Sequence, residues 1–196
     1  SNEVGLFSIL NYQYKKQDFE LGFRSDCAYY DVKYITREVP RYFIDTIQNF
    51  INVSGLFVWN TQIGKKSVFN LSVGAASRAP AINELYSYGL HQGVSGFEEG
   101  DMELLPERSL KTSATFRTES NKFYELEVNG YFQNVQNFIL LVPQLDIVAT
   151  IRGIFPLFKY EQKDVNIFGL DFSSRFNLSR HFTSNLSASL IKGYEL

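Results

Sequence analysis

Cysteine and long apolar runs are almost missing from this 196-residue sequence, which also has a single methionine. Because Cys27 is the only cysteine, the chain cannot form an internal disulfide, and no paired-cysteine spacing for zinc occurs. No apolar run approaches the roughly 20 residues that a transmembrane helix needs. The fold must therefore be held together by backbone hydrogen bonds and packing.

An excess of charge of one sign is also lacking. The formal net charge is −2, and 20% of the residues are charged, so the chain has no basic field for nucleic acid. No Ser-His-Asp order, phosphate-binding glycine loop or HExxH pattern occurs. We therefore expect no nucleic-acid partner and no enzymatic activity, and the sequence implies no cofactor.

Aromatic residues are abundant instead, with 18 Phe, 12 Tyr and 1 Trp. Aromatic side chains favour β-strands and also gather at membrane interfaces. Apolar and polar residues alternate with a period of two, most clearly between 123 and 138. One face of that segment is expected to carry Tyr124, Leu126, Val128, Gly130 and Phe132, and the other Glu125, Glu127, Asn129 and Gln133, with no slip along the strand. Only a strand sorts side chains in this way, so the sequence predicts an all-β fold.

The alternation predicts eight strands, near 3–14, 18–30, 50–62, 67–77, 108–118, 122–139, 158–177 and 181–194. Four tight turns join strands in pairs: Lys15-Lys16-Gln17, Ile63-Gly64-Lys65-Lys66, Glu119-Ser120-Asn121 and Ser179-Arg180. Long loops are expected near 31–49, 78–107 and 140–157. Short turns impose hairpins, which predicts an antiparallel up-and-down meander with no parallel pair. Short turns at one end and long loops at the other are typical of an outer-membrane β-barrel whose loops, and here both chain ends, are extracellular.

A soluble β-barrel or sandwich alternates in the same way. Its apolar face would point inward, whereas in a membrane barrel the polar residues Glu125, Glu127 and Asp171 would line the lumen. Strands of ten or more residues favour the membrane barrel, because a tilted span takes about 9–11 residues. Eight strands of a larger sheet would leave unpaired edges near 3–14 and 181–194. We expect these edges to close into a smaller barrel or to pair with another copy.

Five short motifs follow one another between the fourth and fifth predicted strands. They are Arg78-Ala79-Pro80, Glu84-Leu85-Tyr86, Gly89-Leu90-His91-Gln92-Gly93, Phe97-Glu98-Glu99-Gly100-Asp101 and Leu104-Leu105-Pro106-Glu107-Arg108-Ser109. In this order they resemble the C-terminal β-barrel of TonB-dependent outer-membrane receptors. Two later runs, Gly130 to Ile139 and Phe155 to Asp171, add to the resemblance, which covers most of the chain.

The resemblance implies a barrel of about 22 strands with a plug in its lumen. Residues 1–196 would be a partial barrel, without the plug, the TonB-contacting segment or the closing strand. The location implied is the outer membrane of a Gram-negative bacterium, with membrane lipid as one partner and TonB, through the missing plug, as another. The implied function is uptake of a scarce small-molecule or metal-chelate substrate, such as an iron chelate, haem, a metal ion or cobalamin. A soluble β-barrel binding module and a passive outer-membrane porin are the alternatives.

Candidate substrate-binding residues lie in the 78–107 loop: His91, Tyr86, Tyr88, Glu98 and Asp101. Imidazole and carboxylate groups bind metals or metal chelates, and His91 is the candidate metal ligand. A structural interpretation competes with this one. In it, Pro80 ends a strand because it lacks an N–H group, Gly89, Gly93, Gly96 and Gly100 permit a positive φ, and His91 makes a hydrogen bond that holds the loop.

Overall fold

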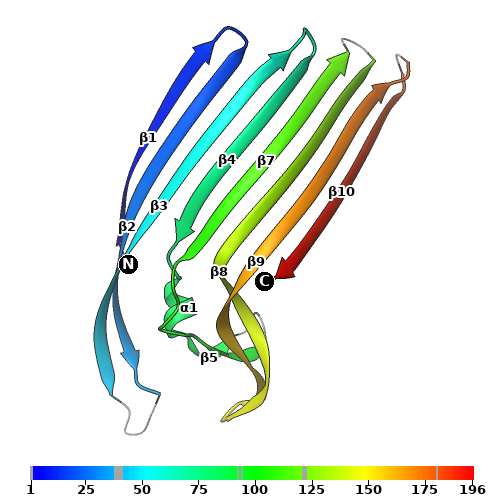
Figure 1. Cartoon of the computed structure of the whole chain (residues 1–196). Coiled ribbons are helices and arrows are strands. Elements are labelled where there is room, and N and C mark those ends of the chain that lie inside the picture. The colour runs from blue at the N-terminus through cyan, green and yellow to red at the C-terminus, as the bar shows by residue number, and fades with distance from the viewer. Residues whose placement is uncertain (1, 38–41, 92, 94, 121–122, 180) are drawn as a thin grey trace.

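One open β-sheet carries nearly all of the chain (Figure 1). The computed structural model describes residues 2–37, 42–91, 93, 95–120, 123–179 and 181–196. Its elements are β1 (Asn2–Tyr14), β2 (Gln17–Ile35), β3 (Phe43–Ile63), β4 (Ser67–Arg78), α1 (Ile82–Tyr86), β5 (Tyr88–His91), β6 (Gly96–Glu99), β7 (Glu107–Ser120), β8 (Tyr124–Thr150), β9 (Gly153–Asn177) and β10 (Thr183–Glu195). No helix in these described ranges is long and apolar enough to cross a membrane.

The eight predicted strands correspond to β1–β4 and β7–β10, and each pairs antiparallel with its neighbour in this series. The short turns lie at one end of the sheet, and the long connections extend beyond the other end, toward which both termini point (Figure 1). Asn121 and Arg180, in two of the predicted turns, lie outside the described residues. The register between β8 and β9 is continuous from Tyr124 to Val135, which confirms the two sorted faces over the named residues from Tyr124 to Gln133. It shifts between Val135 and Phe138, so the strand as a whole is not free of a slip.

Two of the three predicted long loops are wrong, because the strands continue through them. β2 runs to Ile35 and β3 begins at Phe43, so much of 31–49 is a hairpin. β8 and β9 continue through 140–157 to a turn between Thr150 and Gly153. Pairing satisfies the backbone N–H and C=O groups of these extensions. The pairing continues past Pro143, which lacks an N–H group, and the register shifts between Pro143 and Ile147.

The third connection overturns the expectation that every pair is antiparallel. β6 pairs parallel with β9, with Phe97 opposite Leu157 and Glu99 opposite Lys159. β8 occupies one edge of β9 along this stretch, so β6 takes the other edge, beyond the point where β10 ends opposite Val165. The connection folds back and extends the sheet because the edge of β9 is otherwise open there.

The two faces of the sheet differ sharply. On β2, the side chains of Arg24 and Asp26 form an ion pair at 2.7 Å on one face. Residues of the opposite parity, Leu21 and Phe23, lie on the other face and are 53% and 56% exposed. A sandwich or soluble barrel would bury this apolar face. An uncovered apolar face is what the wall of a membrane barrel presents to lipid.

The sheet is not closed on itself. Among the described residues β1 pairs only with β2, and β10 pairs with β9, so the expectation of a smaller closed barrel is wrong. An eight-stranded barrel has an interior just wide enough for side chains. This sheet must also hold the folded 79–106 segment on its polar face, which needs a wider lumen. Edge pairing with a second copy stays a prediction.

Candidate functional site

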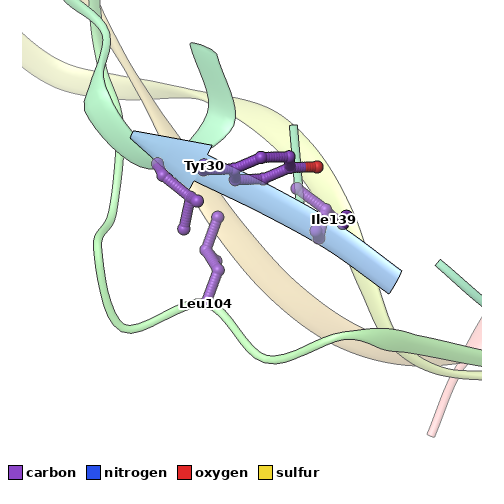
Figure 2. Close-up of a cluster of buried hydrophobic side chains, with 5 residues drawn as sticks. Tyr30, Leu104 and Ile139 are labelled. Carbon is purple, nitrogen blue, oxygen red and sulfur yellow. The ribbon is translucent and has the colours of Figure 1, made fainter. Parts of the chain in front are cut away.

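The segment between β4 and β7 packs on the polar face of the sheet. Leu85 of α1 is completely buried and forms one cluster with Ala28, Tyr30, Leu104 and Ile139 (Figure 2). Tyr30 belongs to β2 and has the same parity as Arg24, which places the cluster on the polar side. Full burial of a leucine contributes about 1.5–3 kcal/mol. The cluster therefore anchors the segment to the wall.

Charged side chains join α1 to the ends of two strands. Glu84 accepts a hydrogen bond of 2.7 Å from the Ala81 N–H, which satisfies one of the free donors at the start of the helix. Arg78, the last residue of β4, donates to Glu84 at 3.0 Å and to Glu107, the first residue of β7, at 2.6 Å. Arg78, Glu84 and Glu107 are called the arginine clamp below.

Two glycines let β6 approach its neighbours closely. A Cβ on Gly96 would lie 2.5 Å from the ring of Phe158, and one on Gly100 would lie 2.7 Å from the Glu84 carbonyl oxygen. None of the four glycines for which the sequence suggested a positive φ, Gly89, Gly93, Gly96 and Gly100, has one, so that expectation is wrong. Gly96 and Gly100 are instead needed because there is no room for a side chain at these two positions.

The structure divides the five candidate site residues into three groups. Tyr86 and Tyr88 line a pocket beside α1. His91 on β5 pairs with Glu98 on β6, with 3.2 Å between Nδ1 and Oε1, and the imidazole is exposed while the carboxylate is buried. Asp101 lies apart and accepts a hydrogen bond from the Glu103 N–H at 2.9 Å.

A metal centre is not assembled in the part of the chain that the structure describes. Within those residues, no group of three or more His, Cys, Asp or Glu side chains gathers closely enough to hold an ion. His91 and Glu98 together offer two potential metal ligands. The expectation that His91 ligates a metal stays a prediction.

The pocket beside α1 has a volume of about 1030 Å³. It lies between the end of β2 and the segment from α1 to β5, and Met102 also lines it. The rings of Tyr34 and Tyr86 pack with centroids 5.3 Å apart. Burial, and secondarily the neighbouring Tyr34, raise the pKa of Tyr86, so its phenol is protonated and can donate a hydrogen bond at neutral pH.

Sequence reasoning missed Tyr34 and Arg37, which line this pocket, and Lys159, which contacts Glu99 on β6. Tyr34 and Arg37 fell in a predicted loop, and Lys159 fell in a predicted strand with no role. Arg37 donates to Glu99 at 2.8 Å and to the Gly100 carbonyl at 2.6 Å, and Lys159 lies 3.4 Å from the other Glu99 oxygen. Val32 and Tyr34 have the parity of Arg24 and Asp26, so apolar residues here take the face that is charged earlier in β2, and the earlier pattern did not predict that the strand continues to Tyr34.

The fold and this site together define a section of the wall of a transmembrane β-barrel. One face is apolar and bare, the other is polar, and a folded loop packs on the polar face at one end. The model of the family "TonB dependent receptor-like, beta-barrel" matches residues 1–194. The chain therefore belongs to the TonB-dependent receptor β-barrel family, which is made up of transporters and receptors of the Gram-negative outer membrane.

Solved structures with the same fold support the assignment. "Copper transporter OprC" has a TM-score of 0.78 and 18% identity over 97% of this chain and 29% of its own. The Serratia marcescens hemophore receptor HasR, in complex with its hemophore HasA and heme, has a TM-score of 0.75 and 16% identity over 97% and 34%. The FrpB iron transporter from Neisseria meningitidis has a TM-score of 0.63 and 14% identity over 98% and 26%. The chain thus spans about a third or less of each of these structures, and no curated protein matches its sequence.

Proposed function

We propose that this chain is a section of the barrel of an outer-membrane importer that takes up a scarce nutrient with energy passed through TonB. The plug, the remaining strands and the TonB-contacting segment would come from sequence outside these residues. The cargo would be a metal complex such as an iron chelate or haem, a metal ion or cobalamin. A copper transporter, a hemophore receptor and an iron transporter share the fold, which favours a metal-containing cargo.

The observation that carries this proposal is the placement of the 79–106 segment. It packs on the polar face, through Leu85 and the arginine clamp, while apolar side chains such as Leu21 and Phe23 stay bare on the other face. Lipid is the environment that suits the bare face, and the folded segment then lies at the lumen. A soluble binding module would have the opposite arrangement.

The candidate site residues take different roles in this function. Tyr86 and Tyr88 would contact cargo in the pocket. His91 and Glu98 would offer an imidazole and a carboxylate, which suits a metal that arrives with ligands of its own. Asp101 would contribute to cargo binding only through its charge, since its side chain turns back to the Glu103 N–H.

Uptake by cells that express the full-length parent protein tests the proposal. Cells with and without TonB would be given ⁵⁵Fe-labelled and ⁶⁴Cu-labelled complexes under metal limitation. The expected result is accumulation of at least one complex that requires both the parent protein and TonB. Uptake that is independent of TonB would identify a passive porin, and recovery of the parent protein outside the membrane fraction would identify a soluble module.

A further inference from the structure

A hollow on the apolar face of the wall lies where β4 ends and β7 begins. Its volume is about 510 Å³. The hairpins β2–β3 and β8–β9 continue past this point on either side, so the wall is shorter between them (Figure 1). Six of the residues that line the hollow are Ile51, Val53, Arg108, Leu110, Asn134 and Gln136. This hollow is called the outer groove below.

The register fixes the face on which the outer groove opens. Asn134 and Gln136 have the parity of Phe132 on β8, which belongs to the apolar face. Arg108 lies directly opposite Gln136, and Leu110 lies directly opposite Asn134. The groove is therefore on the side of the wall that meets lipid in a membrane barrel, away from the folded segment on the polar face.

Arg108 is the one charged residue that lines the outer groove in the described part of the chain. It is exposed and makes no ion pair or hydrogen bond with the other described residues, whereas Arg78 nearby is held by two carboxylates. An arginine on the lipid face is costly at the bilayer midplane and nearly free of cost at the interface. Arg108 is the second residue of β7, at the end of the strand, so it lies at the interface. Its guanidinium is available to an anion there.

Donors and apolar side chains share the outer groove. The Gln136 amide stands beside the Arg108 guanidinium on the neighbouring strand and is also exposed. Val53 on β3 and Leu110 on β7 line the same groove and are 45% and 48% exposed. Asn134 is already engaged, since its Nδ2 donates to Asn166 at 2.8 Å. The groove therefore offers two donor groups next to an apolar surface, which suits an amphipathic anion.

We propose that the outer groove binds one lipid whose head group carries a phosphate, in the leaflet on the side of the long connections. The Arg108 guanidinium and the Gln136 amide hold the phosphate oxygens, and an acyl chain lies along Val53 and Leu110. Arginine suits this partner because its planar fork donates to two phosphate oxygens at once. An acidic protein segment does not suit the groove, because exposed backbone groups find no partner next to hydrocarbon.

Native mass spectrometry of the full-length parent protein in detergent micelles tests the inference. The probes are dioleoyl phosphatidic acid, dioleoylglycerol, which lacks only the phosphate, and glycerol 3-phosphate, which lacks the acyl chains. The protein is expected to retain at least one more molecule of phosphatidic acid than of dioleoylglycerol, and excess glycerol 3-phosphate is expected to leave that molecule bound. Equal retention of the two lipids would overturn the proposal. Displacement by glycerol 3-phosphate would mean a site for a free anion and would overturn it too.

Three substitutions on the apolar face locate the bound lipid. Arg108→Gln is expected to remove one retained molecule of phosphatidic acid. Gln136→Leu suits an apolar face, so the barrel should fold readily, and it is expected to lower the occupancy of the same molecule. Lys192→Gln is the matched control, because Lys192 is an exposed cation opposite Phe168 on the same face and does not line the groove. Retention unchanged by Arg108→Gln, or an equal loss with Lys192→Gln, would show the proposal wrong.

This inference goes beyond the proposed function and requires only that the apolar face meets lipid. TonB-dependent uptake together with lipid retention that Arg108→Gln does not change would contradict the lipid site alone. Uptake without TonB, together with loss of one lipid in Arg108→Gln, would contradict the proposed function alone.

Discussion

Arg78 Nε lies 2.6 Å from Glu107 Oε2, and this contact joins the last residue of β4 to the first residue of β7. The same guanidinium reaches Glu84 of α1 at 3.0 Å. The Arg78 guanidinium therefore joins three points of the chain. These are the end of β4, where the chain leaves the wall, the start of β7, where it returns, and α1 between them. Both carboxylates are mostly buried, so loss of the cation would leave two negative charges close together with poor hydration.

Arg78→Met is expected to loosen the 79–106 segment without unfolding the barrel wall. Loss of a hydrogen-bonded charged partner costs about 1–3 kcal/mol, which corresponds to a roughly 5- to 150-fold increase in local opening. Hydrogen exchange of the full-length parent protein should show faster exchange in α1 and β6 and unchanged exchange in the paired middle of β4. Arg24→Met, which removes an exposed ion pair on the same face, is the control and should leave α1 and β6 unchanged.

Leu85→Ala is expected to destabilise the same segment through its core. The side chain is fully buried between β2 and the 79–106 segment, and truncation of such a leucine costs about 2–5 kcal/mol. Leu105→Ala is the matched control, because Leu105 is 58% exposed and only its backbone makes hydrogen bonds with the Gln162 side chain. Limited proteolysis should cleave 79–106 much faster in Leu85→Ala than in Leu105→Ala. Equal cleavage of the two variants would show that Leu85 does not anchor the segment.

Gly100→Ala is expected to separate β6 from α1. The added Cβ would lie 2.7 Å from the Glu84 carbonyl oxygen, and backbone atoms cannot swing aside as a flexible side chain can. Overpacking of this kind costs about 1–3 kcal/mol. Gly89→Ala is the matched control, since nothing lies within 4 Å of its added Cβ. Hydrogen exchange at the parallel β6–β9 pair should increase only in Gly100→Ala, and identical exchange in both variants would contradict the close packing described here.

Cys27 gives a direct test of which face meets lipid. It is exposed and lies opposite Val4 and Ile51 on the two neighbouring strands, on the apolar face. A spin label on Cys27 of the parent protein in lipid vesicles should be relaxed more by oxygen, which partitions into the bilayer, than by a water-soluble nickel chelate. A label at Asp26→Cys in a Cys27→Ser background should show the reverse. Greater relaxation of the Cys27 label by nickel would place this face in water.

The arrangement of the main strands could be predicted from the sequence because it depends on local pattern. Residues such as Leu126 and Glu127 must point to opposite sides of any strand, and tight turns such as Lys15-Lys16-Gln17 leave only hairpin pairing. The motifs between Arg78 and Ser109 are local too, and in their order they indicate the TonB-dependent receptor family from the sequence alone. The ends of β2, β3, β8 and β9 were missed because these strands continue beyond the predicted membrane-spanning strands. Stretches such as 31–49 carry no local signal that separates a paired extension from a loop.

By itself, then, the sequence determined that the main strands form antiparallel hairpins with one apolar and one polar face, because side-chain alternation is a property of each strand alone. Only the tertiary structure decided which face the 79–106 segment covers, that β6 adds parallel to β9, and that Arg37 and Tyr34 meet Tyr86 and Tyr88 around one pocket. These relationships join residues more than forty positions apart. They follow from the open edge of β9, the burial of Leu85 and the contact of Arg78 with Glu107, none of which is visible in a short stretch of sequence.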